Sequence, residues 1–232
     1  MGRKNKLKKF AAIRDYPNVI ENLHASTEEA LTSSERDPHR LKGKWRGEYF
    51  HNDHPITLEL ACGKGEYTVQ LAQQYPHRNF IGVDIKGARI WRGATEALEL
   101  ALPNVAFLRT RIELLDHFFS PGEVNEIWIT FPDPFLRNSQ AQKRLSSDRF
   151  LDIYRRILPP GARIQIKTDD PDLYAFSVDT WTKAPDLEVI YSDDDIYGKP
   201  LPIPELAIKT FYERMHLKAQ KTIKYLAAIY QG

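Results

Sequence analysis

The feature that most constrains the fold is a regular alternation of short apolar segments with longer helical ones, which begins at Ile56. Buried strands are expected at 57–62, 80–84, 105–108, 126–131 and 162–167. Helices are expected at 66–75, 87–102 and 148–158, with a further helical segment at 205–219. Strands that alternate with helices of ten or more residues favour a parallel sheet wrapped by helices on both faces.

Two more strands are plausible near the C-terminus, at 187–191 and 223–230. These two strands, which a long connection separates, are expected to pair antiparallel at the sheet edge. The sequence therefore predicts an α/β protein with a Rossmann-like, mostly parallel seven-stranded sheet. The predicted domain comprises residues 53–232, and residues 1–52, which lack sustained apolar periodicity, are expected to form a partly flexible basic arm.

Charge is distributed unevenly although the formal net charge is only +2. Residues 1–16 carry six basic side chains against the single acid Asp15. Such segregation is typical of a positive face that meets nucleic acid, but it is also typical of a solvated tail. Charge alone leaves both interpretations open.

Several classes of protein are disfavoured. No apolar run approaches the roughly 20 residues of a membrane-spanning helix, and the basic start has no apolar stretch behind it, as a signal peptide would. The single cysteine, Cys62, excludes an internal disulfide and a cysteine-based metal cluster. The histidines have no zinc-ligand spacing, so no metal is expected. A reducing cytoplasm is the expected location.

A candidate ligand site follows the first two expected strands. Gly63 and Gly65 end the first strand and would let the backbone approach a ligand closely. Asp84 ends the second strand, 19 residues after Gly65, where a carboxylate can accept hydrogen bonds from a ribose. Ligands of such sheets bind at the carboxyl ends of the strands.

The acids near this loop indicate which ligand it suits. Thr68 stands where a dinucleotide fingerprint has a third small residue, and no phosphate-binding Gly-Lys-Ser/Thr sequence follows. Glu59 and Glu66 would repel a pyrophosphate, whereas they suit a positively charged ligand. The loop therefore favours S-adenosyl-L-methionine, which carries a sulfonium and an amino group, over NAD.

A second candidate site follows the fourth expected strand, in the sequence Phe131-Pro-Asp133-Pro-Phe135. The two prolines bias Phe131 and Asp133 toward extended geometry. We expect a stiff loop that presents one carboxylate and one aromatic ring at the end of a central strand.

The motifs together resemble those of the bacterial tRNA (guanine-N7)-methyltransferases. The resemblance runs from about Ile56 to Tyr230. Its elements are Leu58-Glu-Leu-Ala-Cys-Gly-Lys-Gly65, Gly82-Val-Asp84, Phe131-Pro-Asp-Pro-Phe135, Lys143-Arg-Leu145, Lys167-Thr-Asp169 and Thr210-Phe-Tyr-Glu213. It implies a class I methyltransferase that methylates N7 of a guanine in the tRNA variable loop (position 46), acting as a monomer or homodimer.

The resemblance also implies roles for individual residues. Asp133 is implied in catalysis and in the cofactor pocket. The other implied cofactor-binding residues are Glu59, Gly63, Gly65, Asp84 and Arg111. The implied substrate contacts are Arg137, Lys143, Arg144, Asp169, Thr210 and Glu213.

Three positions depart from the family pattern. Phe135 replaces the usual tryptophan and keeps an aromatic ring. The run 139–144 is much less basic than the family's RNA-contacting segment. Arg111 lies near the position at which the family often supplies an acid or amide to the adenine.

Three rival functions remain open at the level of sequence. A methyltransferase acting on a protein or small molecule would share the cofactor loop. A nicotinamide-dependent oxidoreductase would need a third small residue and a catalytic pair that are not clearly present. A non-catalytic RNA-binding protein on the same fold would not need Glu59, Gly63, Gly65, Asp84 and Asp133.

Overall fold

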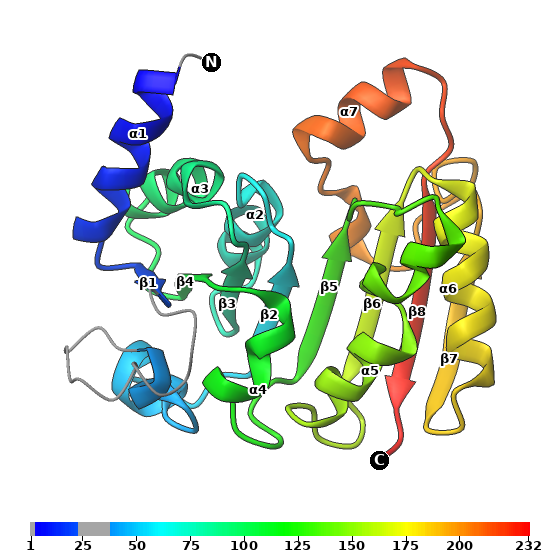
Figure 1. The fold of residues 1–232 in the computed structure, drawn as a ribbon, viewed down its shortest axis with the longest axis horizontal. Coiled ribbons are helices and arrows are strands. Elements are labelled where there is room, and N and C mark those ends of the chain that lie inside the picture. The colour runs from blue at the N-terminus through cyan, green and yellow to red at the C-terminus, as the bar shows by residue number, and fades with distance from the viewer. Residues whose placement is uncertain (1–2, 23–37) are drawn as a thin grey trace. The chain divides into compact units, whose positions relative to one another are not determined.

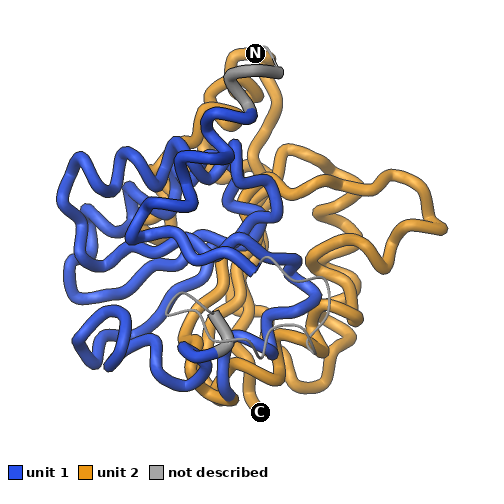
Figure 2. Tube along the Cα trace, turned by 60° about the vertical axis from the view of Figure 1, so that its left-hand side comes forward, with its two compact units in different colours: residues 1–120 blue, residues 121–232 orange. Residues whose placement is uncertain are grey.

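The computed structural model describes residues 3–22 and 38–232 of the chain. By internal contacts it divides into two compact units, residues 1–120 and 121–232, which Figure 2 shows in different colours. Each unit contains four strands among its described residues. No helix in the described ranges is long and apolar enough to cross a lipid bilayer.

The first unit is built on parallel strands in the order β1-β4-β3-β2. Its strands are β1 (Val19–Glu21), β2 (Ile56–Leu60), β3 (Asn79–Val83) and β4 (Val105–Arg109). Its α-helices are α1 (Arg3–Ala12), α2 (Glu66–Gln74), α3 (Gly87–Glu99) and the short α4 (Leu115–Phe118). Helices α2 and α3 pack on the strands, and α1 packs against α3 (Figure 1).

The second unit has strands in the order β5-β6-β8-β7. These are β5 (Glu126–Thr130), β6 (Arg163–Thr168), β7 (Leu187–Asp193) and β8 (Lys224–Tyr230). β5 and β6 pair in parallel, whereas β8 runs antiparallel to both β6 and β7. The α-helices are α5 (Asp148–Arg155), α6 (Pro171–Lys183) and α7 (Phe211–Lys218), of which α6 lies along β7 and β8 (Figure 1).

Apolar burial explains why these segments form strands. All five residues of β2, β3 and β5 are buried, as expected for strands covered on both faces. In the second unit the rings of Trp128 and Tyr225 stack with centroids 6.0 Å apart, and the Tyr225 hydroxyl hydrogen-bonds Gln165 Oε1. Each unit thus has its own buried core, and the loops at the strand ends extend from it.

The predicted α/β architecture is confirmed, including the antiparallel C-terminal pair. The described residues contain eight strands instead of seven because Val19–Glu21 pairs with β4 as β1. Three residues are too few to show a periodicity in sequence. The predicted boundary after residue 52 stays a prediction, and residues 1–2 and 23–37 of that arm lie outside the described residues.

Candidate functional site

The glycine loop between β2 and α2 needs glycine for two separate reasons. Gly63 and Gly65 have φ of 57° and 69°, in the left-handed region that disfavours other residues. A Cβ on Gly65 would also lie 2.5 Å from Cε1 of Phe107, so the site has no room for a side chain. The loop therefore follows a path that only glycine allows at residue 65.

Glu59 is buried under the start of α2. Its Oε2 accepts hydrogen bonds from the Thr68 backbone N–H, at 2.9 Å, and from the Thr68 hydroxyl. A carboxylate here accepts a hydrogen bond from an otherwise unpaired amide of the first helical turn. Its negative charge is also stabilised by the positive end of the helix dipole. Glu59 thereby fixes the helix that carries the glycine loop.

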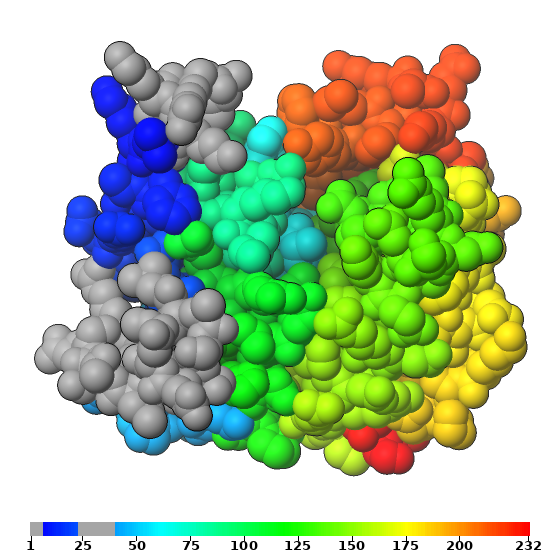
Figure 3. All heavy atoms as spheres, viewed as in Figure 1, coloured from blue at the N-terminus to red at the C-terminus, as the bar shows by residue number. Residues whose placement is uncertain are grey.

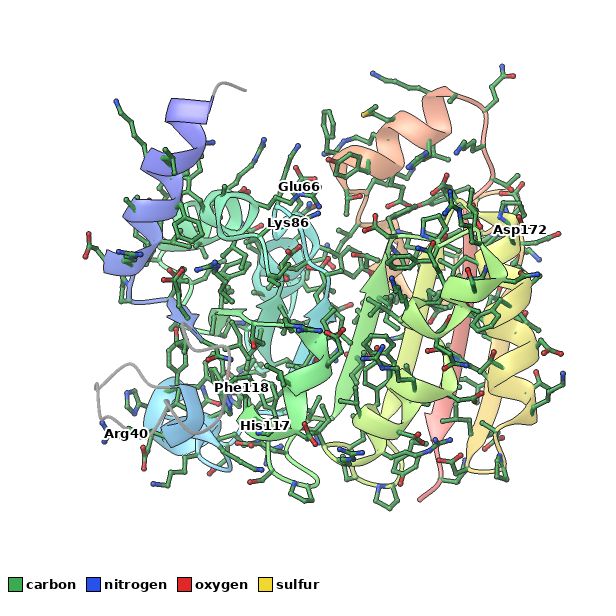
Figure 4. The ribbon with its side chains drawn as sticks, viewed as in Figure 1. Arg40, Glu66, Lys86, His117, Phe118 and Asp172 are labelled. Carbon is green, nitrogen blue, oxygen red and sulfur yellow. The ribbon has the colours of Figure 1, made fainter. Side chains whose placement is uncertain are left out.

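Asp84 joins the carboxyl ends of β2 and β3. Its Oδ2 accepts from the Gly63 N–H at 3.0 Å, and its Oδ1 accepts from the Lys86 N–H at 2.7 Å. Figure 4 shows Glu66 and Lys86 at the same end of this unit, with His117 and Phe118 at the opposite end. The structure thus brings the predicted loop and the predicted acid into direct contact.

The electrostatics of this loop favour a cationic ligand. Burial raises the pKa of the Cys62 thiol well above its usual value, and the charges of Glu59 and Asp84 raise this pKa further. A thiolate is disfavoured there chiefly by burial, and also because the two carboxylates make the local potential negative. The same potential attracts a sulfonium or an ammonium group and repels a pyrophosphate.

Arg111 follows β4 and lies on the surface. Its Nη2 is 3.4 Å from Glu113 Oε1, and the Arg111 side chain is largely exposed. Arg111 itself has an extended backbone and precedes a short 3-10 helix, Ile112–Leu114. A cofactor contact by Arg111 stays a prediction.

In the second unit, the loop after β5 differs from the predicted geometry at its first residue. Phe131 was expected to be extended because it precedes a proline, but its φ is 49°, and Phe135 has a φ of 45°. Two contacts hold Phe131 in this strained region: its N–H donates to the Lys167 carbonyl at 2.8 Å, and its ring stacks on His216. Asp133 is exposed at the tip of this loop.

Arg144 holds that loop in place by hydrogen bonds to its backbone. The side chain is buried, and its Nε and Nη2 donate to the carbonyls of Pro134 and Phe135 at 3.0 and 3.1 Å. Its guanidinium also lies 4.4 Å from the ring centroid of Phe176. Arg144 was predicted to contact the substrate, but its side chain points into the protein.

Two other predicted substrate-binding cations, Arg137 and Lys143, are exposed on either side of the short segment 138–142. Both follow the loop that carries Asp133 along the chain. No described hydrogen bond or ion pair holds either side chain in one orientation.

Asp169, at the end of β6, faces the end of α7. Its Oδ2 lies 2.6 Å from Lys221 Nζ and 3.2 Å from His216 Nδ1. The hydrogen bond to Asp169 raises the pKa of Lys221. Asp169 therefore lies beside the histidine on which Phe131 stacks.

Thr210 and Glu213 form a capping box that begins α7. The Thr210 hydroxyl accepts from the Glu213 N–H, and the Glu213 carboxylate accepts from the Thr210 N–H. Glu213 is fully buried, with Oε1 2.8 Å from Lys167 Nζ and 2.5 Å from the Tyr197 hydroxyl. Figure 3 shows the orange atoms of the α7 region at one edge of this unit.

Sequence reasoning missed Lys167 and Tyr197 as partners of Glu213. Lys167 Nζ also donates to the Ile208 carbonyl at 3.0 Å. The alternation of the strand places Lys167 on the polar face, opposite Ile164 and Ile166, so its burial is shown only by the structure. Among described residues, no group of three His, Cys, Asp or Glu side chains is placed to hold a metal ion.

Comparison with known proteins gives consistent matches across the chain. A family model described as "Putative methyltransferase" matches residues 53–226. A protein of Porphyromonas gingivalis named tRNA (guanine-N(7)-)-methyltransferase is 53% identical, covering 81% of this chain and 76% of its own length. A protein of Christiangramia forsetii with the same name is 44% identical and covers 97% and 98%.

Solved structures support the fold. The 16S rRNA methyltransferase KamB matches with a TM-score of 0.57 and 17% identity, over 86% of this chain and 94% of that chain. The 16S rRNA (adenine(1408)-N(1))-methyltransferase of Catenulisporales acidiphilia matches with a TM-score of 0.60 and 16% identity, over 86% and 96%. At this identity the likeness concerns the fold alone.

Proposed function

This chain belongs to the tRNA (guanine-N(7)-)-methyltransferase family, and we propose that it methylates N7 of a guanine in tRNA with S-adenosylmethionine as donor. The substrate guanine is the one in the variable loop, at position 46. Because tRNA is the substrate, the reaction takes place in the cytoplasm.

The observation that carries this proposal is the contact between Asp84 and the glycine loop. Asp84 is held by the N–H groups of Gly63 and Lys86, and each carboxylate oxygen keeps a lone pair for a ribose hydroxyl. Gly65 packs closely on Phe107, a Cβ on Gly63 would meet nothing nearer than the Ala61 carbonyl at 3.9 Å, and the acids make the loop negative. These residues fit S-adenosylmethionine, which supplies an electrophilic methyl group on a sulfonium.

Glu59 and Arg111 complete the proposed set of cofactor-binding residues. Glu59 acts chiefly by fixing the first turn of α2 and by its negative charge. Arg111 lies after β4, at the same sheet edge as the ends of β2 and β3, because all three strands are parallel. In this proposal the long Arg111 side chain leaves Glu113 to contact the cofactor.

The reaction needs orientation more than proton transfer. N7 of neutral guanine carries a lone pair and no proton, so no general base is required. Positive charge develops on the purine as the methyl group arrives, and a fixed carboxylate stabilises it. Asp133 is assigned this role: it accepts hydrogen bonds from the guanine N1–H and amino group.

The rigid support of the Asp133 loop fits that role. Arg144 binds the two carbonyls after Asp133, and Phe131 before it is fixed by its amide and its ring. A carboxylate on a loop held at both ends loses little entropy when it orients a base. Arg144 is thus a positioning residue in this proposal.

The remaining proposed substrate contacts fall into two groups. Arg137 and Lys143 are exposed cations beside the Asp133 loop and are suited to phosphates. Asp169, Thr210 and Glu213 lie at the start and end of α7 and position its exposed aromatic residues, Phe211 and Tyr212. A guanine splayed out of structured RNA needs such a stacking surface.

The test is methyl transfer from labelled S-adenosylmethionine to unmodified bulk tRNA, followed by nucleoside analysis. We expect 7-methylguanosine from the wild type, and loss of turnover by about 100-fold or more in Asp133→Ala, since one fixed charge is worth about 3 kcal/mol in a transition state. Asp179→Ala, which removes an exposed carboxylate on α6, is the matched control and keeps full activity.

Other outcomes separate the rivals. A different methylated nucleoside would replace the target guanine and keep the cofactor, and S-adenosylmethionine binding without methylated tRNA would move the substrate to another RNA or a protein. Near-normal turnover in Asp133→Ala would remove Asp133 from the reaction.

A further inference from the structure

A row of mostly exposed cations lies on α1 and at the start of α3 in the first unit. Lys86, just before α3, and Arg89 and Arg92 within it occur at three-residue intervals, and all three are exposed. Helix α1, which packs against α3, adds the exposed Lys8 and the half-buried Lys9. We call these five residues the α1–α3 basic surface; Figure 1 shows the two helices next to each other.

None of these cations has an acidic partner among the described residues. Three exposed lysines elsewhere do form ion pairs, Lys44 with Glu48, Lys183 with Asp179, and Lys199 with Asp193, at 2.7 to 3.0 Å. Within the described ranges no ion pair involves any residue of the α1–α3 basic surface. Five positive charges without an ion-pair partner on two adjacent helices produce a positive field that attracts anions.

The surface is also fixed in place before any partner arrives. Ile13, just after α1, is fully buried, and the Tyr16 hydroxyl bonds the Thr95 hydroxyl of α3 at 3.0 Å. Lys9 Nζ lies 3.9 Å above the ring of Trp91. A rigid array of charges loses less entropy on binding than a flexible basic tail.

The segment 139–144, which the family resemblance assigns to RNA contact, offers few cations for phosphate groups. Between residues 139 and 144 only Lys143 and Arg144 are basic, and Arg144 is buried against the carbonyls of Pro134 and Phe135. Phosphate contacts supply most of the affinity of proteins for nucleic acids. A protein that acts on tRNA must therefore make phosphate contacts beyond those of Arg137 and Lys143.

We propose that the α1–α3 basic surface binds the phosphate backbone of the substrate tRNA. This proposal rests on the proposed function, which supplies tRNA as the partner. Regularly spaced, unpaired cations match a line of phosphates, and an acidic protein is the alternative that the experiment tests.

The test is equilibrium binding of tRNA, without S-adenosylmethionine, to the triple variant Lys8→Gln/Arg89→Gln/Arg92→Gln. Loss of three phosphate contacts should weaken binding about 10- to 100-fold near physiological salt and reduce the slope of log K against log salt by about 2 to 3. The KM for tRNA rises in parallel, whereas kcat at saturating tRNA is retained.

The matched control is Lys44→Gln/Lys183→Gln/Lys199→Gln, which removes the same charge from three paired, exposed lysines. Its tRNA affinity and salt slope should equal those of the wild type. Equal losses in both triple variants would show a nonspecific charge effect and overturn the proposal. Unchanged tRNA affinity in the first triple variant would also overturn it, and would leave an acidic protein as the partner to seek.

The two proposals fail in different ways. If the wild type forms no 7-methylguanosine, the proposed function fails, while tRNA binding still reports on the surface. If the wild type methylates tRNA and the first triple variant binds tRNA normally, only the surface proposal fails. If the wild type does not bind tRNA at all, both are wrong.

Discussion

At the scale of single residues, the buried pair of Lys167 and Glu213 has the largest predicted effect on stability. Both side chains are inaccessible to solvent, and burial lowers the pKa of Lys167 while the charge of Glu213 opposes that shift. Replacing Lys167 with Met leaves the Glu213 carboxylate buried without its cation. We expect the free energy of unfolding, measured with urea, to fall by about 3–5 kcal/mol.

The double variant Lys167→Met/Glu213→Gln is the control for this effect. It removes the uncompensated charge and keeps an oxygen that accepts from the Tyr197 hydroxyl, so it should recover a large part of the lost stability. If the double variant is as unstable as the sum of the two single variants, the pair does not act as a unit.

The sequence predicted some residues of the site better than others. Gly65 and Asp84 were predictable because each depends on its position just after a strand. Residue 65 must lack a side chain, and residue 84 must be an acid after the second strand. Arg144 and Glu213 were not, because only the packed structure shows that their side chains point inward. The left-handed Phe131 was predicted wrongly because the preference of a residue before proline was outweighed by tertiary contacts.

At the scale of elements, a bidentate ion pair ties α5 to the turn before β7. Arg155 Nε and Nη2 donate to Asp186 Oδ2 and Oδ1 at 2.6 and 2.7 Å. This hydrogen bonding holds the pKa of Asp186 below its usual range. The pair therefore contributes stability that is fully present above the unfolded-state pKa of about 3.9 and is lost as the pH falls through the lower folded-state pKa.

Asp186→Asn should consequently lower the free energy of unfolding by about 1 kcal/mol at pH 7, with the difference from wild type shrinking below about pH 4. Urea titrations at pH 7, 5 and 3 measure this. Asp179→Asn, which breaks a more exposed pair with Lys183, should show a smaller difference at every pH. A pH-independent loss in Asp186→Asn would mean that packing, and not charge, explains it.

The elements themselves followed closely from sequence periodicity, with informative exceptions. β1 is only three residues long and gains its strand geometry from pairing with β4. Helix α6 was not expected, although Asp170 caps it by accepting from the Leu173 N–H and Pro171 is its first residue. That Asp-Pro start is a readable signal of a helix N-terminus. Figure 4 places Asp172 in this first turn.

At the scale of the whole molecule, cofactor binding should stabilise the folded chain, because S-adenosylmethionine binds the folded state and not the unfolded one. At 100 times its Kd, a ligand adds about 2.7 kcal/mol. For a chain of 232 residues this corresponds to a rise in Tm of about 5–10 °C. Thermal denaturation with and without S-adenosylmethionine measures the shift.

The same measurement on Asp84→Ala tests whether Asp84 carries the binding. This variant loses two hydrogen bonds to the Gly63 and Lys86 amides, so its own Tm is lower, but the decisive quantity is the further shift on adding S-adenosylmethionine. We expect that shift to vanish at the concentration used for the wild type. Asp116→Ala, in the short α4 of the same unit, should keep the full shift. An equal shift in Asp84→Ala and the wild type would place the ribose elsewhere.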